Sequence, residues 1–76
     1  MENTIIKHKL IEDYIIVAVV NIFSDDWSDW AVYKTIFDED MTLEDNIVHT
    51  SKRGDKIRQE SAELYFPEFK KHTWRN

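Results

Sequence analysis

The sequence predicts an α+β domain in which a three-stranded antiparallel β-meander is followed by one or two helices. Three observations lead to this prediction. Runs of β-branched and aromatic residues fill the first half of the chain, the hydrophobic period becomes helical after residue 42, and acidic or turn-forming residues separate the runs. The strand candidates have short connections, which favours pairing in chain order. We expect the helices to pack on one face of the sheet.

The three strands are predicted at about residues 4–11, 14–23 and 30–37, with Glu12 and Asp13 as a turn. The middle run is apolar on both of its alternating faces, as in a central strand covered on both sides. Two short helices would cover only one face, and a large exposed apolar patch usually marks an interface. We therefore expect a homodimer or another partner on the second face.

The helices are predicted at about residues 43–50 and 55–66. Thr42 is a candidate N-cap, followed by acidic residues that the helix dipole favours in a first turn. Gly54 suits a helix C-terminus, and Asp55 is a candidate N-cap for the second helix. The alternative is one continuous helix across both segments, with Gly54 as a tolerated defect.

The 76 residues make one domain, close to the lower size limit for a single core. Residues 68–76, after Pro67, form a basic tail, which is either mobile or docked under the sheet through Phe69 or Trp74. Cysteine is absent, so disulfides and thiolate metal sites are excluded. The N-terminus lacks signal-peptide features, and the longest apolar run is too short to span a membrane as a helix. We expect a cytoplasmic protein without membrane contact.

Negative charge is concentrated in the middle of the chain. Residues 25–45 hold eight acids against Lys34 alone, a net charge of −7, whereas the whole chain carries −5. The remainder is therefore slightly basic. Such segregation bears on partners and encounter rates rather than on the fold.

The acidic residues do not form a recognisable metal site. A calcium-binding loop starting at Asp38 would need glycine at its sixth position and a glutamate at its twelfth, where this chain has Leu43 and His49. A looser site within residues 25–29 is less common than ordinary solvated loop acids. We predict no metal and no cofactor.

Catalytic patterns are also missing from the sequence. The three histidines lie far apart in sequence, no serine has a nucleophile-elbow context, and the single glycine cannot build a phosphate-binding loop. The sequence therefore favours a non-enzymatic protein.

Basic residues suggest an alternative function in nucleic-acid binding. Residues 52–58 carry +3, from Lys52, Arg53, Lys56 and Arg58 against Asp55, and residues 70–75 of the tail carry a further +3 with the histidine neutral. The acidic segment would repel phosphates, so direct binding of nucleic acid is disfavoured.

The leading hypothesis is a small interaction protein that uses an acidic surface to bind and inhibit a basic, nucleic-acid-binding protein. Carboxylates spaced over a rigid surface can imitate a phosphate backbone, and Trp27 would add a large aromatic anchor. Small size and segregated charge also occur in accessory proteins of phages and other mobile elements, which is an association only. The predicted binding residues are Asp25, Asp26, Trp27, Asp29, Asp38, Glu39, Asp40, Glu44 and Asp45.

Overall fold

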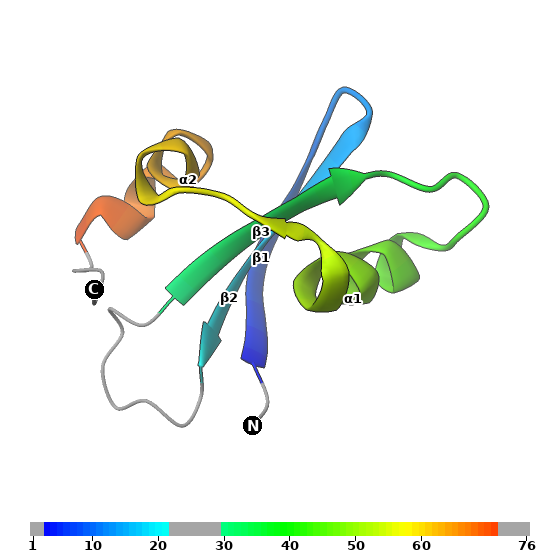
Figure 1. Ribbon diagram of the computed structural model, residues 1–76, viewed down its shortest axis with the longest axis horizontal. Helices are drawn as coiled ribbons and strands as arrows, with labels where there is room; N and C mark the ends of the chain where they lie inside the picture. The colour runs from blue at the N-terminus through cyan, green and yellow to red at the C-terminus, as the bar shows by residue number, and fades with distance from the viewer. Residues whose placement is uncertain (1–2, 22–29, 72–76) are drawn as a thin grey trace.

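The computed structural model describes residues 3–21 and 30–71 and confirms the α+β class. Figure 1 shows the strands crossing the molecule diagonally between two separate helices. The elements in chain order are β1 (Asn3–Ile11), β2 (Tyr14–Asn21), β3 (Trp30–Ile36), α1 (Leu43–Arg53), β4 (Asp55–Lys56), α2 (Gln59–Tyr65) and the 3-10 helix η1 (Pro67–Lys71).

The strands form one antiparallel sheet in the order β1-β2-β3-β4. The predicted meander is confirmed, and the described bounds of its three strands lie within two residues of the predicted ones. The short strand β4 was not predicted. Its two residues pair with Tyr33 and Lys34 of β3, so they extend the sheet instead of starting the second helix.

Strand β2 is buried on both faces, as its sequence predicts. One face carries Ile15, Val17 and Val19, against which Ile47 of α1 packs. The other face carries Ile16, Ala18 and Val20, which share a core with residues of α2 and η1. We call these the α1 face and the α2 face of the sheet.

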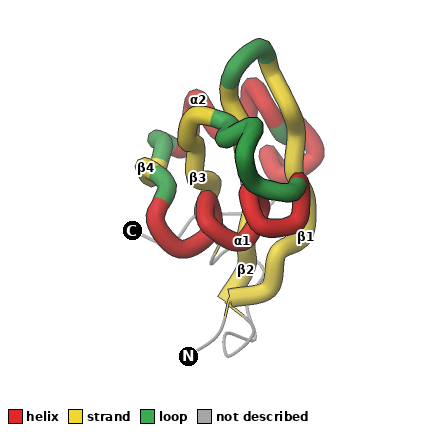
Figure 2. Tube along the Cα trace, turned by 90° about the vertical axis from the view of Figure 1, so that its right-hand side faces the viewer, coloured by secondary structure: helices red, strands yellow, loops and turns green. Residues whose placement is uncertain are grey.

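The two helices therefore lie on opposite faces, which corrects the expected packing on one face. Figure 2 shows α1 in front of the strands and α2 behind them. The chain passes from one face to the other around the edge of β3, where β4 pairs and the Ile57 amide donates to the Val32 carbonyl at 2.9 Å. A strand that is apolar on both sides requires cover on both sides, and one chain supplies it. A homodimer no longer follows from an uncovered face.

Two helices are present rather than one continuous helix. Helix α1 begins after the predicted N-cap Thr42, whose side chain accepts a hydrogen bond from the Asp45 amide at 3.1 Å, and it runs three residues beyond the predicted end. Helix α2 begins later than predicted, after Arg58, so Asp55 is not its N-cap. The reason is that the intervening residues pair with β3.

Glycine is needed at position 54, the C-cap of α1, because a side chain would collide with neighbouring backbone atoms, and not because of its backbone angles. Its φ of −68° is accessible to any residue. A Cβ atom at this position would lie 2.6 Å from the Thr50 carbonyl oxygen and 3.2 Å from the Lys34 carbonyl oxygen. Glycine thus allows the end of α1 to approach β3 closely.

The start of the predicted tail is part of the core. Phe69 of η1 is buried, with its ring centroid 4.7 Å from that of Trp30 and 5.7 Å from that of Phe66. Docking through Phe69 is therefore confirmed, while Trp74 lies outside the described residues.

Two lysines of β1 hold this segment against the sheet. Lys7 forms a salt bridge with Glu68, and Lys9 donates a hydrogen bond to the Tyr65 carbonyl. The Lys7 hydrogen bond lowers the pKa of the Glu68 carboxyl, with a further contribution from the Glu68 backbone amide.

Candidate functional site

An acidic surface forms at one end of the sheet from two segments that are distant in sequence. The Phe37 amide donates to the Asp13 carbonyl at 2.8 Å, which fixes the β1–β2 turn beside the loop that leads into α1. Figure 1 shows this turn rising above the end of the β3 arrow. We call this surface the acidic end; it comprises Glu12, Asp13, Asp38, Glu39, Asp40, Glu44 and Asp45.

The seven side chains of the acidic end are all exposed. Among the side chains that the structure describes, none forms a salt bridge with these carboxylates. Their charge is thus directed to solvent rather than neutralised within the fold. A concentration of one sign on one side of a small domain attracts partners of opposite charge and speeds their encounter.

A buried asparagine sets the shape of the acidic end. The Asn46 side chain is fully buried in the first half of α1. Its Oδ1 accepts from the Asp38 amide, and its Nδ2 donates to the carbonyls of Asp38 and Thr42, each at 2.9 Å. A third contact reaches the Met41 carbonyl at 3.3 Å. One amide group therefore ties the whole loop 38–42 to the helix that follows it.

Some of the acids also have local structural roles. The Asp38 carboxylate accepts a hydrogen bond from the Asp40 amide at 2.9 Å, which makes an Asx turn. Glu44 and Asp45 lie in the first turn of α1, where the helix dipole favours negative charge. Glu39 and Asp40 have no such side-chain role among the described contacts, so they are the best positions for testing recognition.

The structure divides the predicted binding residues into two groups. Asp38, Glu39, Asp40, Glu44 and Asp45 lie together at the acidic end. The others, namely Asp25, Asp26, Trp27 and Asp29, lie outside the described residues.

The flanks of that second group are far from the acidic end. The described residues that flank it, Asn21 and Trp30, stand at the opposite end of β2 and β3. Trp30 is the first of the seven residues of β3 and Phe37 follows the last, so roughly 20 Å of strand separates them.

Sequence reasoning missed Glu12 and Asp13 as members of the acidic end, treating them only as a turn. The predicted topology contained the signal that would have found them. In an antiparallel meander, the first turn and the exit of the third strand lie at the same end, while the second turn lies at the other. The meander therefore places residues 12–13 beside residues 37–45.

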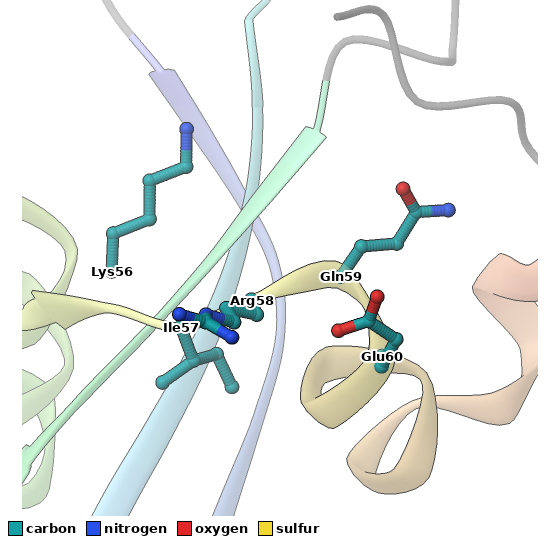
Figure 3. A pocket seen from close by; sticks show the side chains of 5 residues that line it. All are labelled: Lys56, Ile57, Arg58, Gln59 and Glu60. Carbon is teal, nitrogen blue, oxygen red and sulfur yellow. The ribbon is translucent and has the colours of Figure 1, made fainter.

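A second feature is a shallow pocket of about 420 Å³, formed by residues that follow α1 in the chain. It is lined by Lys56, Ile57, Arg58, Gln59 and Glu60, which connect β4 to α2. Figure 3 shows the Lys56 side chain extending away from Ile57, with Gln59 and Glu60 at the start of α2. Lys52 and Arg53, in the last turn of α1, precede these residues in the chain, and we call Lys52, Arg53, Lys56 and Arg58 the basic strip.

Comparison with protein-family models, curated proteins and solved structures found no match to this chain. Within the described residues, no three histidine, aspartate or glutamate side chains are grouped so that they could hold a metal ion. In the same residues, no helix is long and apolar enough to cross a membrane. A functional proposal therefore depends on the geometry and charge of the surface.

Proposed function

We propose that this chain is a non-enzymatic interaction protein that binds a basic protein through the acidic end. One observation supports this most strongly: the β1–β2 turn and the loop before α1 are joined by the Phe37–Asp13 hydrogen bond, and together they present seven exposed carboxylates. Where the partner holds DNA or RNA, the acidic end occupies the same basic site and inhibits it.

The rigidity of the acidic end supports recognition rather than simple solubility. Asn46 fixes the loop backbone from inside, and the Asx turn at Asp38 fixes it from outside. A surface that is already ordered loses less conformational entropy on binding than a flexible acidic segment would. Opposite charges across the interface then provide specificity and a fast association rate.

Charge reversal at Glu39 and Asp40 tests this function. The variant E39K/D40K raises the net charge by four without removing a hydrogen bond described for these side chains. The matched control D55K/E60K makes the same change of charge outside the acidic end, in β4 and the first turn of α2, and circular dichroism verifies both folds. In capture experiments from the native cell, basic proteins should be lost with E39K/D40K and kept with D55K/E60K. Equal loss with both variants would contradict the proposal.

The segment 25–29 is tested separately. The variant D25K/D26K/D29K addresses the loop that the sequence favoured. If the triple variant abolishes binding and E39K/D40K leaves it unchanged, the contact lies in the segment 25–29 instead of the acidic end.

An alternative function, nucleic-acid binding, has the basic strip as its support. Lys56 and Arg58 line the pocket, and Lys52 and Arg53 precede them. Labelled single- and double-stranded DNA and RNA at low salt discriminate the two functions, because only a phosphate-binding strip gives direct, salt-sensitive binding.

A further inference from the structure

A row of exposed apolar side chains crosses the sheet next to the acidic end. The strand register places Ile11 opposite Tyr14, and Tyr14 opposite Ile36. Their exposed fractions are 37%, 37% and 68%. We call these three residues the apolar row.

The apolar row lies on the α2 face but beyond the cover that α2 and η1 provide. Lys34 shares this face, because its Nζ lies 4.3 Å from the centroid of the Tyr14 ring. Ile16, the next β2 residue on the same face, is buried. Lys9, which pairs with Ile16, donates to the Tyr65 carbonyl and lies over the Phe66 ring. Cover of the α2 face thus ends one row before Tyr14.

The acidic end borders this row directly. Glu12 follows Ile11 in the chain, Asp13 precedes Tyr14, and Asp38 comes two residues after Ile36. Three apolar side chains therefore adjoin a group of carboxylates, with Lys34 as the cation on the inner side. The complementary surface is apolar in its centre and basic on the side that meets the carboxylates.

We propose that the apolar row and the acidic end together dock a basic amphipathic helix of the partner protein. This inference rests on the function proposed above and names the element of the partner that binds. The row spans two strand spacings, roughly 10 Å. Apolar residues at positions i, i+3 or i+4, and i+7 of a helix cover about the same length, since each residue rises about 1.5 Å. Lysine and arginine on the flanks of that helix then meet the carboxylates.

A second copy of this chain fits the surface poorly. A two-fold contact through the apolar row would place the acidic end of one copy near that of the other. Like charges brought together across an interface oppose association.

Two synthetic 14-residue peptides test the inference by fluorescence anisotropy. Both contain the same leucines and lysines; one places the leucines on a single helical stripe, and the other scrambles them. We expect the striped peptide to bind at least about tenfold more tightly to the wild-type chain, because only its leucines can be buried together.

Two matched variants locate the contact. The substitution Ile36→Gln should weaken binding of the striped peptide by about tenfold or more. The control Leu10→Gln changes a side chain of similar exposure, 53%, which belongs to the α1 face because Leu10 pairs with Ile15. It should change the affinity less than about twofold.

The outcomes separate this inference from the proposed function. One outcome is that both peptides bind equally, with binding lost in E39K/D40K and kept in I36Q. That result would overturn docking of a helix on the apolar row and would leave the acidic end as a binding surface. Failure of both peptides to bind the wild-type chain would contradict the acidic end as well. Sedimentation that shows a dimer for the wild-type chain and a monomer for I36Q would overturn the inference in favour of a second copy.

Discussion

Asn46, an uncharged side chain, organises the acidic end. It satisfies one backbone amide and contacts three backbone carbonyls of the loop 38–42 from a fully buried position. Buried polar groups contribute little net stability when paired, but they are costly when a partner is removed. The position of every acid in this loop therefore depends on one amide group.

Replacing Asn46 should lower stability and loosen the acidic end. For Asn46→Ala we expect a loss of about 2–4 kcal/mol in the free energy of unfolding, because backbone groups lose their partners inside the fold. Urea denaturation measures the loss. A variant as stable as the wild-type chain would show that water replaces the amide without cost.

The variant Asn46→Asp should add a pH dependence. A carboxylate at this position would face three carbonyl oxygens, so burial and repulsion would raise its pKa in the folded state. Its destabilising effect relative to the wild-type chain should therefore be largest at neutral pH and shrink as the pH falls and the carboxyl is protonated. Thermal denaturation of both chains across this range checks the direction, and a pH-independent difference would contradict it.

The salt bridge between Lys7 and Glu68 should give stability the opposite pH dependence: it stabilises the fold at neutral pH, and this contribution is lost in acid. Because the folded-state pKa of Glu68 is lowered from 4.5, its contribution is present above that pH and is lost as the pH falls through the folded value. The wild-type chain should melt above Glu68→Gln at neutral pH, and the two melting temperatures should converge in acid. Since both side chains are partly exposed, added salt should also reduce the difference. A difference unaffected by acid and salt would contradict this account.

At the scale of elements, the division of the helices between two faces explains the buried middle strand. Strand β4 carries the chain around the sheet edge, and Gly54 permits the close approach from which that crossing starts. The 3-10 helix η1 then completes the core on the α2 face through Phe69. Each connecting element is short, so substitutions of its buried or sterically confined residues should have large effects.

The substitution Gly54→Ala should be destabilising although its backbone angles suit alanine. The new Cβ would meet a backbone oxygen, which cannot move aside as a flexible side chain could. We expect a loss of about 1–3 kcal/mol, measured by urea denaturation. The adjacent control Asp55→Ala is exposed and should change stability by less than about 0.5 kcal/mol. Equal urea midpoints for Gly54→Ala and Asp55→Ala would contradict the steric explanation.

The packing of η1 is tested by a pair of aromatic and aliphatic truncations. Phe69 is 7% exposed, whereas Leu64 of α2 is 81% exposed. The substitution Phe69→Ala should therefore cost about 3 kcal/mol or more, and Leu64→Ala about 0.5 kcal/mol or less, in thermal or urea denaturation. A small effect at Phe69 would mean that η1 is dispensable for the core.

At the scale of the whole molecule, charge and apolar surface are distributed unevenly. The acidic end and the apolar row share one end of the sheet, while the basic strip lies in the last turn of α1 and in the segment that follows it. This polarity supports a single direction of approach for a basic partner.

Local patterns in the sequence predicted the strands, the N-cap at Thr42 and the buried character of β2. They could not predict which face each helix covers, because that depends on how Asp55 and Lys56 pair with β3 across the sheet edge. The buried role of Asn46 was also inaccessible, since an asparagine in a first helical turn looks like an ordinary surface residue. The full acidic end could have been predicted, because the meander alone brings residues 12–13 to residues 37–45.

The most direct test of the central claim locates the contact on the chain itself. A uniformly ¹⁵N-labelled sample is titrated with the striped lysine–leucine peptide, and amide chemical shifts are followed. We expect the largest changes at residues 11–14 and 36–45. Changes concentrated at residues 52–60 or 22–29, with the acidic end unaffected, would contradict it.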